Sequence, residues 1–228
     1  MDGIDIIDKA IDQLISINHN KYLMSDKQVA FFGDTNKVML LDLKKSEWTI
    51  KTINNNSNSS RVGMAGQGNQ GGVNLDFMYY AAAVTLPNGD SLITGGGSST
   101  TVYQYMNAKC EIVLRANMNQ MRKEHAAVIN GPYVYVMGGY DGVQNIFLNC
   151  CELYNIQKNE WKYFAPMNIS KCAFSATVVN KEYIYTFGGY DGQQRLDAIE
   201  RYHIKDGSWE LLTVKLKFPL SNCACFCP

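Results

Sequence analysis

Short runs in which apolar and polar residues alternate recur along the chain, separated by glycine, asparagine and aspartate. Runs such as "YVYVM" (133–137) and "YIYTF" (183–187) have the two-residue period of β-strands and end at two adjacent glycines. Asn-Gly at 88–89 and 130–131 and Asn-Lys at 180–181 precede such runs, and these dipeptides favour the positive φ angles of tight hairpins. The pattern predicts antiparallel strands joined by short turns.

One unit of this pattern returns after about fifty residues. "MGGYDG" is followed by "FGGYDG", and the tyrosine and tryptophan downstream return with a shift of 48 residues. The matched positions are Gly138, Gly139, Tyr154 and Trp161 in one copy and Gly188, Gly189, Tyr202 and Trp209 in the other. Each unit reads as a four-stranded antiparallel sheet. Because one such sheet cannot bury both of its faces, the units must pack beside one another.

Two earlier copies of the unit are weaker. "LITGGG" supplies the glycines of the second copy, which has Ile112 at the tryptophan position. The first copy keeps Trp48 seven residues after Leu41, the same interval that separates tyrosine from tryptophan in the two later copies. The shared interval argues against chance.

Strand order, the spacing near fifty residues and the Gly-Gly, Tyr and Trp landmarks together resemble the kelch repeat, whose units are blades of a β-propeller. The resemblance implies that the diglycines end the second strand of each blade. It also implies aromatic packing within and between blades by Trp48, Tyr154, Trp161, Tyr202 and Trp209. The fold class expected is all-β, a propeller over residues 18–228. The blades are expected near 18–53, 77–115, 121–165 and 172–214, with a partial blade at 217–228.

The glycines could instead form a phosphate-binding loop. Such a loop leads into a helix N-terminus and carries an adjacent lysine, whereas here "GVQNIFL" and "GQQRLDA" lead on to another strand. We therefore interpret the glycines as backbone devices at a strand end. Asp141 and Asp191 are expected to form turns by accepting local N–H groups.

Two segments fall outside the repeat. Residues 1–17 carry apolar side chains three and four apart, which predicts a short amphipathic helix. Residues 54–74 are rich in Asn, Ser and Gly without periodicity, which predicts a disordered insert loop. Ordering of this loop by a ligand is the alternative.

Four units and the beginning of a fifth fit poorly with a closed ring, because propellers generally have about four to eight complete blades. The sequence therefore predicts an incomplete propeller. Two explanations stay open: truncation relative to a longer protein, which we favour, or coverage of the open edges by another chain.

Composition narrows the class of partner. Twenty-one Lys and Arg balance twenty-one Asp and Glu, so no overall field attracts nucleic acid or anionic lipid. The N-terminus is acidic, no run of 18 apolar residues occurs, and seven cysteines lack the spacing of a disulfide framework. We expect a cytoplasmic protein with a protein partner, and neither nucleic acid nor membrane as a partner.

The connectivity of the strands places two kinds of loop on one face: those joining the second strand to the third, and those leading into the next blade. Tyrosine and arginine on such loops supply rigid contact area and forked hydrogen-bond donors. The candidate partner-binding residues on this face are Arg122, Lys123, Tyr140, Tyr190, Gln193 and Arg195.

The function expected is a non-enzymatic protein-interaction module without cofactor. The resemblance suggests substrate recognition for a cullin-type ubiquitin ligase or binding to cytoskeletal proteins. An enzyme with its active site at the channel mouth, or a purely structural array, are the alternatives. His19, His125 and His203 lack partners at motif spacing. The terminal C-x-C-x-C is spaced too closely for a typical zinc site, so neither catalytic nor metal residues are expected.

Overall fold

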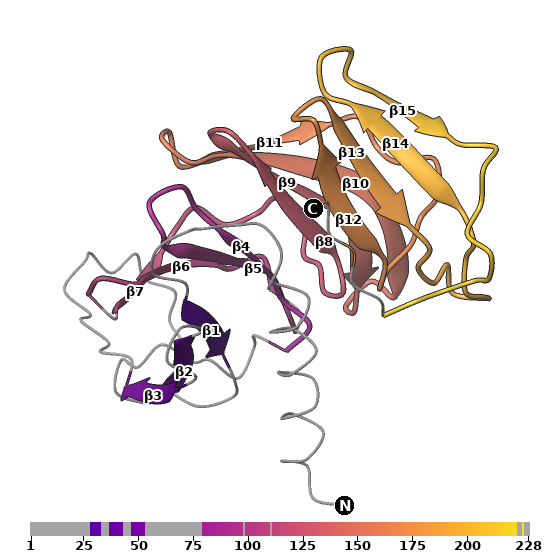
Figure 1. The fold of residues 1–228 in the computed structure, drawn as a ribbon. Coiled ribbons are helices and arrows are strands. Elements are labelled where there is room, and N and C mark those ends of the chain that lie inside the picture. Colours follow the sequence, from indigo (N-terminus) through magenta and orange to yellow (C-terminus); the bar gives the residue numbers. More distant parts are fainter. Residues whose placement is uncertain are drawn as a thin grey trace, which may run out of the picture. The chain divides into compact units, whose positions relative to one another are not determined.

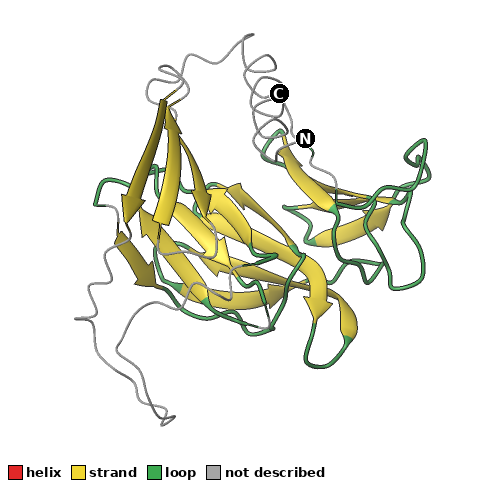
Figure 2. Cartoon of the chain, turned by 90° about the horizontal axis from the view of Figure 1, so that it is seen from below, coloured by secondary structure: helices red, strands yellow, loops and turns green. Residues whose placement is uncertain are grey.

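The computed structural model describes three early strands by their backbone, and most of the chain from Tyr79 onward with side chains. The described ranges are 28–32, 37–42, 47–52, 79–97, 99–109, 111–222 and residue 225. All regular elements in these ranges are β-strands (Figures 1 and 2). None of these residues belongs to a helix that could cross a membrane. The predicted helix of residues 1–17 and the insert loop of residues 54–74 lie outside the described ranges.

The chain divides into two compact units, Met1–Thr52 and Ile53–Pro228. The first contains an antiparallel sheet of β1 (Gln28–Phe32), β2 (Lys37–Asp42) and β3 (Glu47–Thr52). In its register Trp48 lies opposite Leu41. These strands correspond to the second, third and fourth strands of the predicted first blade, whose first strand lies outside the described residues.

The second unit contains three four-stranded antiparallel sheets, each with its strands in chain order. Sheet 2 consists of β4 (Ala82–Thr85), β5 (Ser91–Thr94), β6 (Val102–Met106) and β7 (Glu111–Leu114). Sheet 3 consists of β8 (Ala126–Asn130), β9 (Tyr133–Asp141), β10 (Ile146–Asn155) and β11 (Glu160–Phe164). Sheet 4 consists of β12 (Ser175–Val179), β13 (Tyr183–Phe187), β14 (Ile199–His203) and β15 (Ser208–Leu211). The predicted all-β blades are confirmed.

The first strands of neighbouring sheets lie next to one another, since β8 contacts both β4 and β12. Figure 1 shows the last strands, β7, β11 and β15, on the outside of this arrangement. A chain that runs outward through each sheet must return inward to begin the next. We call the residues directly before the first strand of a sheet its leading turn. The three leading turns of this unit contain Tyr80 before β4, Glu124 before β8 and Ala173 before β12.

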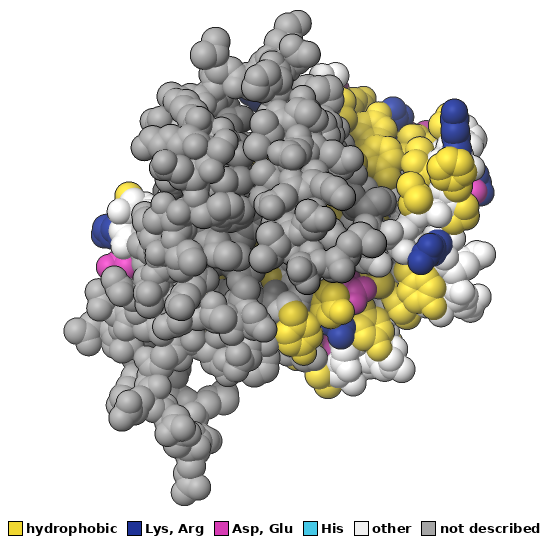
Figure 3. Space-filling model, turned by 60° about the horizontal axis from the view of Figure 1, so that its bottom comes forward, with side chains coloured by type: hydrophobic (Ala, Val, Ile, Leu, Met, Phe, Trp, Pro, Cys, Tyr) yellow, Lys and Arg dark blue, Asp and Glu magenta, His cyan; other side chains and the backbone are white. Residues whose placement is uncertain are grey.

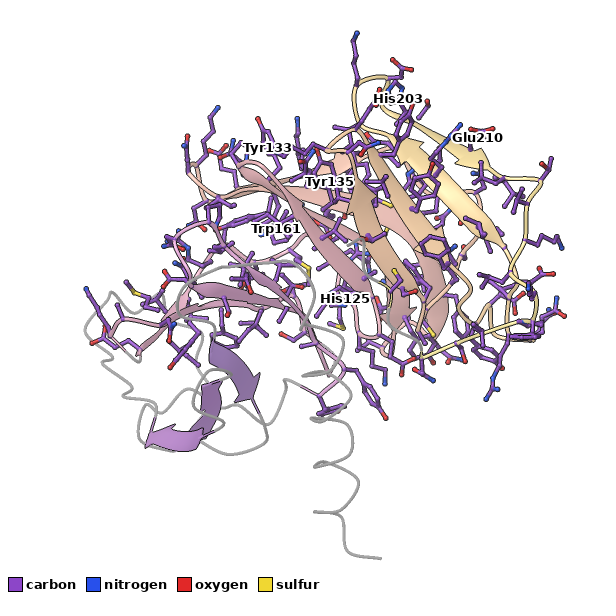
Figure 4. The ribbon with its side chains drawn as sticks, in the orientation of Figure 1. His125, Tyr133, Tyr135, Trp161, His203 and Glu210 are labelled. Atoms are coloured by element: carbon purple, nitrogen blue, oxygen red, sulfur yellow. The ribbon has the colours of Figure 1, made fainter. Side chains whose placement is uncertain are left out.

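Apolar side chains fill the contact between sheets 2 and 3, which we call the 2–3 interface. Leu92 of sheet 2 packs with Val134, Val136 and Tyr154 of sheet 3, all fully buried. The ring of Trp161 lies 4.8 Å from that of Tyr154, and its indole N–H donates to the carbonyl of residue 116 at 2.8 Å. Figure 4 shows Trp161 on the side of sheet 3 that faces sheet 2.

The 3–4 interface repeats this arrangement. Tyr202 and Trp209 of sheet 4 pack into the core with Tyr135 of sheet 3. The ring centres of Tyr202 and Trp209 lie 5.1 Å apart. The indole N–H of Trp209 donates to the carbonyl of Ala165 at 2.9 Å. The aromatic positions that return 48 residues apart in the sequence therefore make the same contacts in successive sheets.

The diglycine of sheet 3 does not end its strand as expected, because β9 continues to Asp141; in sheet 4, β13 does end at Phe187, directly before Gly188. Two leading turns contact Gly138 and Gly139. A Cβ at Gly138 would lie 2.8 Å from the carbonyl oxygen of Lys171, and one at Gly139 would lie 2.7 Å from that of Lys123. Both glycines also have positive φ, which side chains disfavour. The N–H of Gly139 donates to the Lys171 carbonyl at 2.9 Å. The pair therefore bends the main chain and joins sheet 3 to the turn that begins sheet 4.

Candidate functional site

The leading turns are joined in series by backbone hydrogen bonds. The N–H of Glu124 donates to the carbonyl of Tyr80 (2.9 Å), that of Ala173 to Glu124 (2.8 Å), and that of Asn222 to Ala173 (2.7 Å). All four residues have φ between 52° and 63°. Non-glycine residues seldom adopt this conformation, so its fourfold recurrence identifies one turn geometry, which is used before sheets 2, 3 and 4 and again at residue 222.

Residues 220–222 occupy the position of a further leading turn. The N–H of Gly189 donates to the carbonyl of Leu220 at 2.7 Å. The N–H of Gly139 makes the same bond to Lys171, the corresponding residue of the preceding turn. The segment therefore meets sheet 4 as the start of another blade would, within the range where the sequence predicts one.

An aromatic row crosses the face formed by these turns and by the loops after the diglycines. Its members are Tyr80, Lys123, Tyr140, Phe147 and Tyr190. The ring of Phe147 lies 5.0 Å from Tyr140 and 5.7 Å from Tyr190. The ammonium of Lys123 lies 5.4 Å from the ring centre of Tyr140 and 5.7 Å from that of Tyr80. Rings and cation thus connect three sheets.

Figure 3 brings the lower side of Figure 1 forward, and there exposed hydrophobic side chains lie beside Lys or Arg and Asp or Glu side chains in the described part. Tyr80 is 60% exposed, and the other four members of the aromatic row are half-buried. The row therefore offers ring area to solvent while its members support one another.

Local hydrogen bonds hold the tyrosines of the row in place. The hydroxyl of Tyr140 donates to the side-chain oxygen of Asn145, and that of Tyr190 donates to the carbonyl of Gly192 at 2.9 Å. Gly192 itself packs on Phe147, because a Cβ there would lie 2.6 Å from the ring. The side chains of the row are therefore arranged before any partner arrives.

The aspartates of the two "YDG" loops serve their own turns. Asp141 accepts the N–H groups of Val143 and Gln144 at 2.9 and 3.0 Å. Asp191 accepts those of the next loop at 2.8 Å each, and these donors lower its pKa. The prediction that both aspartates form turns is confirmed, and neither carboxylate is left as a bare charge on the face.

Arg122 corrects the set of residues predicted to bind a partner. Its side chain is fully buried, pairs with Glu152 at 2.9 Å and donates to the carbonyls of Gly138 (2.6 Å) and Cys150 (3.0 Å). A buried guanidinium needs such partners, and here they come from the core of sheet 3. A partner on the surface cannot reach this side chain.

The same device recurs in the 3–4 interface with lysine. Lys171 pairs with Glu200 at 2.8 Å, and both side chains are fully buried. Burial lowers the pKa of Lys171, and the neighbouring carboxylate opposes that shift. Glu200 also accepts the N–H of Asn168 at 2.7 Å. Glu152 and Glu200 therefore each bind the chain segment that leads into their own sheet. The sequence signal for them was the glutamate that recurs two residues before the repeated tyrosine.

The structure brings three of the remaining predicted residues together and leaves two beside them. Lys123, Tyr140 and Tyr190 belong to the aromatic row. Gln193 and Arg195 are exposed on the loop that carries Tyr190, and a backbone bridge joins Arg195 to Tyr190. Sequence reasoning missed two members of the row. Phe147 is the second residue of β10 and Tyr80 lies just before β4, so neither carried a loop signal.

His125 lies between sheets 2 and 3, where Figure 4 labels it. Its Nε2 is 2.8 Å from the hydroxyl of Thr94, and its Nδ1 has no hydrogen-bond partner among the described residues. Burial, together with the nearby Arg122, lowers the pKa of His125 to about 3. The hydroxyl of Thr94 is therefore the side-chain partner of this ring. At neutral pH the imidazole is an uncharged core group.

The cysteines of the described region form no disulfide with one another. Burial raises the pKa of Cys151 and of Cys172 to about 12, and the carboxylate of Glu124 adds to the effect at Cys172. Such thiols stay protonated and are poor nucleophiles. No group of three His, Cys, Asp or Glu within the described ranges could hold a metal ion. Two of the three terminal cysteines lie outside those ranges.

Sheets joined through leading turns, diglycines and a tyrosine–tryptophan pair define a blade-repeat protein of the propeller class. The model of the Kelch motif matches residues 121–168 and 171–213, which contain sheets 3 and 4. These matches support a likeness to the kelch-repeat family over sheets 3 and 4.

Two human proteins (Homo sapiens) carry the likeness. Kelch-like protein 6 is 33% identical over 96 residues, which are 42% of this chain and 15% of that protein. Kelch-like protein 4 is 49% identical over 41 residues, 18% of this chain and 5% of that protein. The matched segments thus span a small part of either relative.

Proposed function

We propose that this chain is a non-enzymatic protein-interaction module that binds a partner protein through the face carrying the aromatic row. The observation that supports this most is the unbroken sequence of ring and cation contacts from Tyr80 to Tyr190. It crosses three sheets and is supplied by turns, a loop and the adjoining ends of β9 and β10, close to the loops, where side-chain variety is tolerated best.

Physical properties of the row favour binding over a purely structural role. Tyrosine and phenylalanine supply large contact areas and lose little conformational entropy on association. The hydroxyls of Tyr140 and Tyr190 are already fixed by their own loops, so a partner meets a surface that needs little ordering. Preorganisation of this kind raises affinity because less entropy is lost on binding.

The wider role of the protein is a part of the same proposal. The resemblance to kelch-repeat proteins favours substrate recognition for a cullin-type ubiquitin ligase, with binding to a cytoskeletal protein as the second option. Protonated, buried thiols in the described region suit a reducing, cytoplasmic location. In either role the face with the aromatic row selects the partner.

A peptide selection tests the binding face. A library of random peptides is selected on the immobilised full chain and then on the Tyr140→Ala/Tyr190→Ala double variant. Tyr163→Ala is the matched control, since Tyr163 is 55% exposed on β11. Peptides that bind the parent and the control but lose at least tenfold in affinity on the double variant support the proposal. Absence of any such peptide, with all three proteins folded by circular dichroism, overturns it.

A further inference from the structure

Tyr80 has an exposed ring, and its backbone adopts a conformation that other residue types adopt more readily. Its φ is 63° and its exposure 60%. Asn222 occupies the equivalent position before the next sheet with φ 54°, and asparagine is among the few residue types that adopt this region readily. A bulky tyrosine is strained there. The fold alone therefore does not account for a tyrosine at this position.

The backbone of this turn, and not the ring, holds the sheets together. The carbonyl of Tyr80 accepts the N–H of Glu124, and the carbonyl of Tyr79 accepts that of Gly97 at 2.8 Å. The rings of Tyr79 and Tyr80 meet edge to face at 5.6 Å and are both more than half exposed. Any residue able to adopt the turn would supply the same backbone bonds.

Lys123 is likewise not demanded by the fold. It forms an isolated backbone bridge with Tyr140, and in the next leading turn Cys172 forms the same bridge with Tyr190. A buried cysteine therefore satisfies the position that Lys123 fills. The ammonium of Lys123 rests over two tyrosine rings, and no carboxylate among the described residues forms an ion pair with it.

The described acids around the row do not pair with this cation. Four other basic side chains of the described region do pair with acids: Arg122 with Glu152, Lys171 with Glu200, Arg201 with Glu210 and Lys215 with Asp197. The nearby aspartates are occupied by backbone N–H groups. Glu124 accepts the thiol of Cys172 at 3.1 Å. The face therefore presents positive charge beside aromatic surface.

We propose that Lys123, together with Tyr80 and Tyr140, binds an acidic side chain of an extended partner segment. The carboxylate pairs with the ammonium of Lys123, and an adjoining apolar residue lies on the exposed ring of Tyr80. Ring quadrupoles already favour the cation in this position, so the incoming carboxylate meets a positioned charge. This inference rests on the proposed function and adds the chemistry of the partner.

Two single variants of the full chain test it with the selected peptides. Lys123→Met removes the charge and keeps the length of the side chain; Lys162→Met, on β11, is its control. We expect acidic residues in the selected peptides and about tenfold weaker binding by Lys123→Met, the usual effect of losing a charged hydrogen bond. The affinity of the parent should fall as salt rises, and that of Lys123→Met should fall less.

Tyr80→Gly separates binding from folding. Relief of the strained φ should leave the melting temperature equal to or above that of the parent, while peptide affinity falls at least tenfold. Peptides that need Tyr140 and Tyr190 but carry no acid, or that bind Lys123→Met as tightly as the parent, overturn the inference and leave the proposed function standing. Affinity unchanged in Tyr80→Gly likewise removes Tyr80 from the site.

Discussion

The 2–3 and 3–4 interfaces share a backbone arrangement and differ in side-chain chemistry. In both, the second glycine of a diglycine donates to the carbonyl of a buried basic residue, Arg122 at 3.1 Å and Lys171 at 2.9 Å. Three residues later the chain places His125 in one interface and Phe174 in the other. The turn geometry therefore sets the contact, whereas the residues inside it vary.

The variation changes how each interface responds to protonation. An arginine side chain is not deprotonated in proteins, and His125, three residues after Arg122, is held neutral by burial. Lys171 can lose its proton, and its ammonium lies 5.1 Å from the ring centre of Phe174. Two contacts of the same shape therefore have different electrostatic requirements.

The largest loss of stability is expected on removal of either tryptophan, and the loss should be the same in both interfaces. Trp161→Ala and Trp209→Ala each remove a ring packed against a buried tyrosine and an indole hydrogen bond. Each should lower the free energy of unfolding by about 3–5 kcal/mol, the usual cost of removing a large aromatic side chain from a core. Urea denaturation followed by tyrosine fluorescence measures both.

Arg195→Ala provides the control for this pair, because its exposed side chain lies on a loop and should change stability by less than about 0.5 kcal/mol. A Trp161→Ala protein as stable as the parent would contradict the packing described for the 2–3 interface. A difference of several kcal/mol between the two tryptophan variants would break the equivalence of the interfaces.

The buried ion pairs should separate the interfaces. Glu152→Gln leaves the guanidinium of Arg122 buried without its counter-charge, which costs about 3–5 kcal/mol. Glu200→Gln should cost less, because Lys171 can become neutral. Loss of the carboxylate lowers the lysine pKa further in the folded state only. The loss of unfolding free energy in Glu200→Gln should therefore become smaller as pH rises from 7 to 9. The loss in Glu152→Gln should stay constant over the same range.

Urea denaturation of both variants and the parent at pH 7 and pH 9 measures this difference. A Glu200→Gln penalty equal to that of Glu152→Gln at both pH values would show that lysine and arginine are interchangeable in this position. A Glu152→Gln penalty that decreases with pH would contradict a permanently charged Arg122.

Much of the fold could be predicted because its signals are local. Alternating runs, Asn-Gly turns and the returning Gly-Gly, Tyr and Trp positions each report on a few consecutive residues, and the three complete sheets follow them. The landmarks Tyr154 and Tyr202 are buried in equivalent places for the same reason.

The candidate site was harder to predict because its signals are long-range. Arg122 and Lys123 are neighbours in the sequence, yet one meets Glu152 in the core and the other meets Tyr80 on the surface. The sequence around "NQM" does not indicate whether the side chain of the basic residue that follows lies in the core or on the surface. The exposure of Tyr80 depends on a left-handed φ, which no residue type there announces.

The smallest effect expected is a pH dependence confined to the 2–3 interface. The pKa of His125 is about 3 in the folded chain against an ordinary 6.5, so the unfolded chain binds a proton that the folded chain does not. Stability contributed by this residue is therefore complete above pH 6.5 and decreases as pH falls toward 3. The loss between pH 7.5 and pH 5 should be about 2 kcal/mol.

His125→Phe installs the residue that the 3–4 interface already uses and removes the titrating group. Other groups also titrate below pH 6, so the informative quantity is the difference between variant and parent. The parent should lose about 2 kcal/mol more than the variant between pH 7.5 and pH 5, measured by urea denaturation. Equal losses in the two proteins would mean that the imidazole is solvated or paired. The two interfaces would then not differ in the way that their leading turns indicate.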